Sequence, residues 1–90
     1  MERHVSEILK ADIAPISKIM YLYFCMRADE KGRAAVRYKD IAKNVNISST
    51  ATVHKYANAL VKAGLITKDM PMEEGSYTGS NVYTICNWKG

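Results

Sequence analysis

The apolar side chains of residues 2–11 are spaced as on one face of a helix. Ile8 and Leu9 follow Val5 at three and four positions, with charged residues among them. An amphipathic helix of this kind needs a cover for its apolar face. That cover is either the chain's own domain or a second copy of the chain, and in the second case residues 1–13 form a dimerisation element.

Residues 16–28 carry apolar side chains around most of a helical circumference, which predicts a helix buried at the centre of the domain. Pro15 suits the first turn of this helix, and Asp12 is a residue type that caps helix N-termini. The polar segment 29–33 is expected to end the helix, with Gly32 as its C-cap.

A strand-like stretch at residues 34–38 precedes two further segments with helical spacing. Residues 39–45 predict a short helix, and Asn46 after it tolerates the left-handed backbone of a sharp turn. Residues 49–62 predict another helix, which Gly64 ends. The two helices are therefore joined by a tight turn.

The end of the chain predicts a β-hairpin. Residues 65–68 and 81–86 have strand character, and residues 70–80 between them form a loop with proline and glycine. The predicted fold class is α+β, with a helical core and a C-terminal two-stranded hairpin over residues 14–90.

This order of elements, and the residues at its centre, resemble a winged helix–turn–helix. Residues 38–48 resemble the first half of the motif, in which a small residue, here Ala42, lets two helices approach closely. Tyr38 stands where related proteins place a capping Ser or Thr, so it is either a weaker cap or part of the strand. Residues 49–66 resemble the second half, with a Thr-Val pair, a leucine seven residues later and a closing Gly-Leu-Ile. Over residues 14–86 the chain is similar to small helix–turn–helix regulators of bacteria, phages and mobile elements, and to replication-initiator domains.

The second helix of the motif has a polar face opposite its apolar one. If Val53 points to the core, Leu60 falls beside it at 100° per residue. Asn58 and Lys55 then face outward, where an amide suits adenine and an ammonium suits guanine. His54 and Lys62 have an alternative interpretation as ordinary solvated side chains. Thr50 and Thr52, near the start of this recognition helix, are expected to bind phosphate. The full set of expected DNA contacts from the helix is Ser49, Thr50, Ala51, Thr52, His54, Lys55, Asn58 and Lys62.

Positive charge is concentrated in the middle of the chain. The net charge is +4, and residues 34–66 carry five Lys and Arg side chains against the single acid Asp40. Phosphate contact requires such a block, although a solvated lysine-rich surface has the same composition. The expected contacts to the DNA backbone are Arg37, Lys39 and Lys43.

The predicted wing departs from the usual pattern. Its tip carries Glu73 and Glu74, whereas wings that enter a minor groove often carry Lys or Arg. The wing therefore stays away from the duplex, binds protein, or contacts DNA through neutral groups. The neutral candidates are Tyr77, Thr78, Ser80 and Asn81.

The composition argues against several other classes of protein. No apolar run approaches the ~20 residues that span a membrane, and no signal peptide is visible, so we expect a cytoplasmic protein without a membrane partner. Cys25 and Cys86 have apolar surroundings typical of reduced thiols. Because nucleophile motifs, phosphate-binding glycine loops and paired metal ligands are missing, we expect no enzyme activity, no cofactor, no metal and no small-molecule effector.

These features together predict a small transcriptional regulator that binds double-stranded DNA sequence-specifically, as a homodimer at a two-fold operator. Two alternatives stay open at this stage. The same fold serves as the DNA-binding module of phage or plasmid replication and partition proteins. An acidic wing also suits a winged helix that binds protein.

Overall fold

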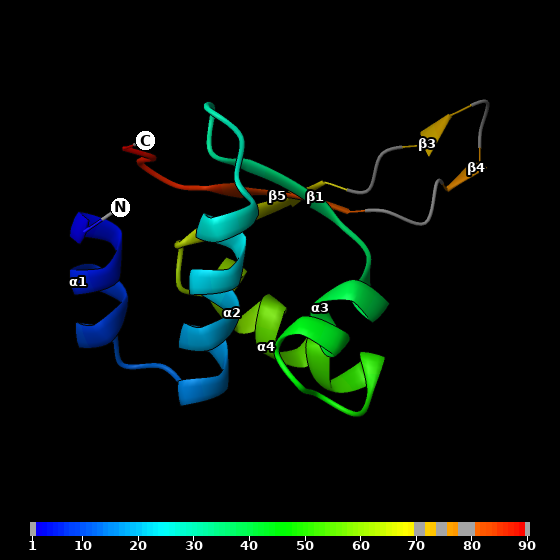
Figure 1. Cartoon of the computed structure of the whole chain (residues 1–90), viewed down its shortest axis with the longest axis horizontal. Helices are drawn as coiled ribbons and strands as arrows, with labels where there is room; N and C mark the ends of the chain where they lie inside the picture. Colours follow the sequence, from blue (N-terminus) through cyan, green and yellow to red (C-terminus); the bar gives the residue numbers. More distant parts are fainter. Residues whose placement is uncertain (1, 70–71, 74–75, 78–80, 90) are drawn as a thin grey trace.

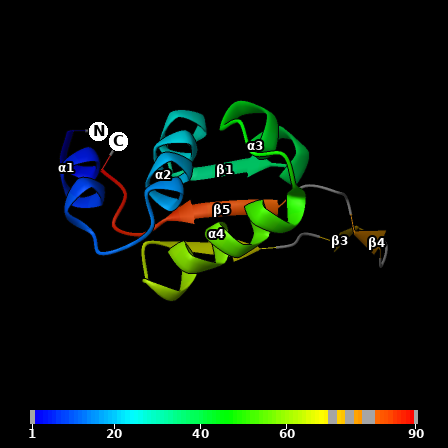
Figure 2. The same cartoon turned by 90° about the horizontal axis from the view of Figure 1, so that it is seen from below.

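The computed structural model describes residues 2–69, 72–73, 76–77 and 81–89. Over these residues the protein is a small α+β fold with four helices and a three-stranded antiparallel sheet. Figure 1 and Figure 2 show α2, α3 and α4 on one side of this sheet. The elements are α1 (Glu2–Lys10), α2 (Pro15–Arg27), β1 (Arg33–Val36), α3 (Tyr38–Asn44), α4 (Thr50–Lys62), β2 (Ile66–Asp69), β3 (Met72–Glu73), β4 (Ser76–Tyr77) and β5 (Asn81–Ile85).

The sheet corrects the prediction of a two-stranded hairpin. Its strand order is β1-β5-β2, so β5 is central and pairs with β1 as well as with β2. Ala34 lies opposite Tyr83, and Ile66 lies opposite Ile85. Buried residues alternate along β5, so one face of this strand lies on the core, together with Val36 of β1 and Ile66 of β2. β3 and β4 form a separate two-stranded sheet beyond β2.

Helix α2 packs across the sheet and forms the centre of the core, as its apolar sequence predicts. Phe24 is fully buried and stacks on Tyr83, with ring centroids 4.4 Å apart. The prediction of a buried helix holds for only part of its apolar circumference, because Ile19 is 51% exposed and Met26 is 69% exposed. α2 therefore has an outer side that its own domain leaves uncovered.

The ends of α2 also differ from the prediction. Ala14 is the N-cap residue and Pro15 begins the helix, so Asp12 is not the cap. Ala28 is the C-cap, and Gly32 lies further on, in the turn before β1, with a φ of 80°. Two features favour glycine at this position. The backbone is left-handed, and the Trp88 side chain packs directly against the residue, where a Cβ would overlap it.

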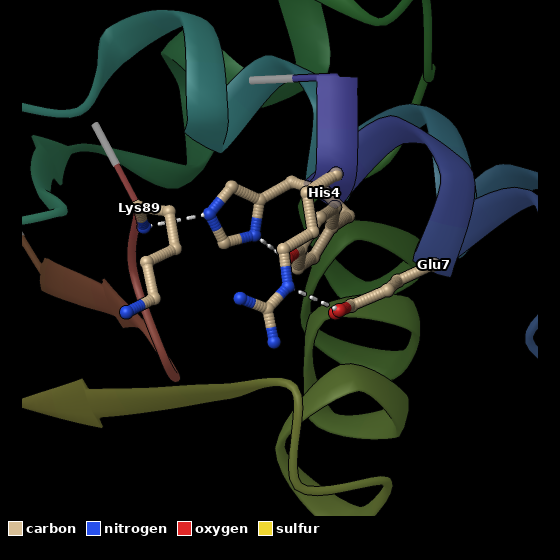
Figure 3. Close-up of polar contacts among 5 residues, drawn as sticks. His4, Glu7 and Lys89 are labelled. Atoms are coloured by element: carbon tan, nitrogen blue, oxygen red, sulfur yellow. Dashed lines mark hydrogen bonds and ion pairs between the residues drawn. The ribbon is translucent and has the colours of Figure 1, made fainter.

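Helix α1 packs on its own domain through His4 and Ile8, both of which are buried. The His4 ring stacks on Trp88, its Nδ1 lies 3.1 Å from the Tyr21 hydroxyl, and its Nε2 accepts a 2.8 Å hydrogen bond from the Lys89 backbone N–H. Figure 3 shows these two bonds on opposite sides of the ring. The histidine therefore ties the first helix to the last residues of the described chain.

Burial in the core changes the chemistry of two side chains near α1. Desolvation raises the pKa of the Cys25 thiol to about 11, and it raises the pKa of Tyr21 to about 12. Cys25 is buried, Cys86 is half-buried, and both thiols are free, as predicted. Cys25 is therefore a protonated packing residue rather than a nucleophile.

Candidate nucleic-acid interface

The α3–turn–α4 unit has the tight turn that the sequence predicts. Asn46 adopts a φ of 57°, and the Ile47 N–H donates a 2.8 Å hydrogen bond to the Ala42 carbonyl. This bond closes the end of α3 in the manner of a Schellman motif, in which a residue with positive φ follows the helix. The turn thereby sets the direction in which α4 leaves α3.

The inner face of α4 is fixed by core packing, as the sequence predicts. Val53 and Leu60 are fully buried and Ala57 nearly so. The buried Ser17 hydroxyl of α2 donates a 3.0 Å hydrogen bond to the Tyr56 carbonyl. This bond and the apolar contacts leave α4 little freedom to rotate about its axis.

The outer face of α4 is therefore the predicted one. Ala51, His54, Lys55, Asn58 and Lys62 are all exposed. This surface carries a small side chain, an amide and cationic groups. Neither of the two ion pairs among the described residues includes a residue of this surface. The surface can donate hydrogen bonds from Asn58 and Lys55 without first breaking a salt bridge.

The N-terminus of α4 is only partly arranged as predicted. Ser49 is the N-cap residue, but its hydroxyl caps none of the described backbone N–H groups. Ser49 and Thr50 are exposed, whereas Thr52 is half-buried. The first two side chains are therefore accessible to a phosphate, and Thr52 is less so.

The basic residues assigned to the DNA backbone lie on and before α3. Lys39 and Lys43 are exposed and four positions apart, so they share one face of the helix. Arg37 is exposed at the N-cap position in an extended conformation. Tyr38, whose position the sequence left open, is the first residue of α3 rather than part of β1.

A cluster beside α4 was missed by the sequence analysis. Tyr38, His54 and Lys68 come from α3, α4 and β2 and contact one another through the Tyr38 hydroxyl. Lys68 lies beyond the motif and outside the positively charged block, so no spacing in the sequence pointed to it. The contact arises because β2 runs back along α4 while pairing with β5, which brings Lys68 to Tyr38 at the start of α3.

The wing residues have mixed outcomes. Asn81 is fully buried in β5 and its amide donates a 3.2 Å hydrogen bond to the Tyr83 hydroxyl, so it is a core residue and not a wing contact. Tyr77 lies in β4. Thr78, Ser80 and Glu74 lie outside the described residues.

The described residues contain neither a metal-binding cluster nor a membrane-spanning helix. No group of three or more His, Cys, Asp or Glu side chains in the described residues is arranged to hold a metal ion. Among the described helices, none has the length and apolar character needed to cross a membrane. Comparison with protein-family models, curated proteins and solved structures finds no match.

Proposed function

We propose that this protein binds double-stranded DNA sequence-specifically, with α4 in the major groove, and acts as a small cytoplasmic transcriptional regulator. The observation that carries the proposal is the outer face of α4, where Lys55, Asn58 and Lys62 are exposed while Val53 and Leu60 anchor the opposite face. A helix held in this way presents a fixed set of donors to base edges.

We interpret the fold as a winged helix on the arrangement of its elements. α3 and α4 form the helix–turn–helix, and β2 and β5 extend from the same end of the domain toward β3 and β4 (Figure 1). The major groove admits an α-helix, and flanking elements then meet the phosphate backbone. Lys39 and Lys43 on α3 supply the charge that such contacts need.

Replacing Asn58 tests the assignment of base contacts. We expect Asn58→Ala to reduce discrimination between a selected duplex and random duplexes by about 1–3 kcal/mol, since a bidentate amide contact is lost. The contrasting variant is Lys43→Ala, which should weaken binding to all duplexes alike and lower the salt slope by about 0.9. Competition titrations monitored by fluorescence anisotropy measure both effects. Unchanged sequence preference in Asn58→Ala would show that α4 does not read bases as proposed.

We further propose that the protein forms a homodimer, although of the three residues first expected at its interface only Leu9 is available. Ile8 is buried in the chain's own core and cannot contact a partner, and Val5 is half-buried. Leu9 is 61% exposed, and Ile19 and Met26 of α2 are also exposed. These three are the large apolar side chains that the described surface leaves uncovered, and a second copy would cover them.

A double variant tests the dimer. We expect wild-type protein to sediment as a dimer and Leu9→Asp/Ile19→Asp to sediment as a monomer, because two charges would be buried without partners. Both side chains are exposed in the single chain, so the fold itself should tolerate the change, which circular dichroism checks. An unchanged sedimenting mass would exclude this surface.

A further inference from the structure

Three side chains meet where α3, α4 and β2 come together. The Lys68 ammonium donates a hydrogen bond to the Tyr38 hydroxyl and lies 4.8 Å from the centre of the Tyr38 ring. The same hydroxyl lies 2.9 Å from Nδ1 of His54, and the two rings meet edge to face. A lysine and a histidine therefore converge on one hydroxyl at the border of the exposed face of α4.

When His54 is neutral, one arrangement of the protons in this cluster lets the Tyr38 hydroxyl both accept a hydrogen bond and donate one. The Lys68 ammonium can only donate, so the Tyr38 oxygen accepts from it, and in this arrangement the Tyr38 O–H donates to Nδ1 of His54. The ring proton of the histidine is then on Nε2. Within the part of the chain that the structure describes, no residue bonds to Nε2, and His54 is exposed.

His54 and Lys68 thus keep N–H donors that no acceptor among the described residues occupies. One N–H of His54 points away from Tyr38, and the Lys68 ammonium keeps two donors beyond the one given to the hydroxyl. Neither ion pair among the described residues includes Lys68. An anion with more than one acceptor oxygen suits such a group, because it can accept from both side chains at once.

We propose that Tyr38, His54 and Lys68 bind one phosphodiester group of the DNA backbone, beside the groove that α4 occupies. The inference rests on the proposed function, because it names a further contact of the same surface. His54 and Lys68 donate to the two non-bridging oxygens of the phosphate, and Tyr38 is a positioning residue that orients the histidine ring. Contacts of this kind fix the register of a protein on DNA without reading sequence.

The position of the His54 proton can be measured without DNA. We expect nitrogen NMR of the wild-type protein at mildly alkaline pH to show the proton on Nε2. Tyr38→Phe should weaken that preference, because the hydroxyl that donates to Nδ1 is removed while the ring remains. A proton on Nδ1 in the wild-type protein would overturn the arrangement and the proposal with it.

Duplex binding supplies the second test. Lys68→Gln should weaken binding to selected and random duplexes alike, by about tenfold, as for the loss of one charged hydrogen bond. His54→Ala and Tyr38→Phe should each weaken binding, and the double variant should bind no worse than His54→Ala alone, because Tyr38 acts through His54. Lys10→Gln removes the same charge from α1, far from α4, and should bind as the wild-type does (Figure 1).

The outcomes separate this inference from the proposed function. Wild-type protein that binds no duplex at low salt overturns both. Duplex binding that Lys68→Gln and Lys10→Gln affect equally overturns the phosphodiester site and leaves the proposed function intact. A third outcome is that inorganic phosphate shifts the NMR signals of His54 while duplex affinity is insensitive to Lys68→Gln. The cluster would then bind free phosphate and not the DNA backbone, which also overturns the phosphodiester site.

Discussion

Gly32→Ala is expected to lower the free energy of unfolding by about 3 kcal/mol, as the sum of backbone strain and steric overlap. The glycine has a φ of 80°, and a Cβ built on it would lie 2.5 Å from Cγ of Trp88. That atom is the root of the indole, so the whole side chain must move. The movement would disturb the stack on His4 and the hydrogen bond from Trp88 Nε1 to the Glu30 carbonyl.

Gly64→Ala is the matched control for this prediction. Its φ of 75° is nearly the same, but a Cβ there would meet nothing within 4 Å. We expect this variant to lose about 1 kcal/mol, from backbone strain alone. Thermal unfolding measures the difference, since about 3 kcal/mol lowers the midpoint by roughly 15 °C in a domain of this size. Equal losses in the two variants would show that Trp88 does not pack on Gly32 in solution.

Phe24→Ala is expected to cost about 4 kcal/mol, the largest effect of any single truncation proposed for this protein. The ring is fully buried between α2 and the sheet and stacks on Tyr83. Its removal leaves a cavity that the flanking backbone cannot close. A loss of this size is a large part of the roughly 5–15 kcal/mol that stabilises a typical domain. We therefore expect the melting midpoint to fall so far that part of the variant is unfolded at about 37 °C.

Met26→Ala provides the comparison on the same helix. Both truncations are compared in the monomeric Leu9→Asp/Ile19→Asp background, so that the proposed dimer does not contribute. Met26 is two residues beyond Phe24 and exposed in the single chain, and its truncation there should change the free energy of unfolding by less than about 0.5 kcal/mol. Chemical denaturation of both variants gives the two values directly. Phe24→Ala with native stability would contradict the central position of α2 in the core, and with it the support that α2 gives to α4.

Local patterns predicted most of the helices and the direction of α4. The spacing of Val53, Ala57 and Leu60 alone defined the inner face, because side chains on a helix recur every 3.6 residues whatever packs against them. The backbone conformations of Asn46 and Gly64 were also predictable, since few residue types tolerate a positive φ.

Pairing between distant segments was not predictable in this way. β1 is short, and nothing in its four residues says that it pairs with β5 rather than standing alone. The same holds for Asn81, which has the composition of a turn residue but is buried beside Tyr83 at the start of β5. Burial of a polar side chain depends on a partner from the fold, which the local sequence does not name.

The sequence by itself therefore determined the helices, their turns and the cationic face of α4, because each depends on neighbours within one or two turns of the chain. Only the tertiary structure decided which apolar residues are covered, with Ile8 buried and Leu9, Ile19 and Met26 left at the surface. It alone brought Lys68 to Tyr38 and His54, since that contact depends on how β2 packs against α4 and β5. Contacts across the chain depend on how elements pack together, and no local spacing records that.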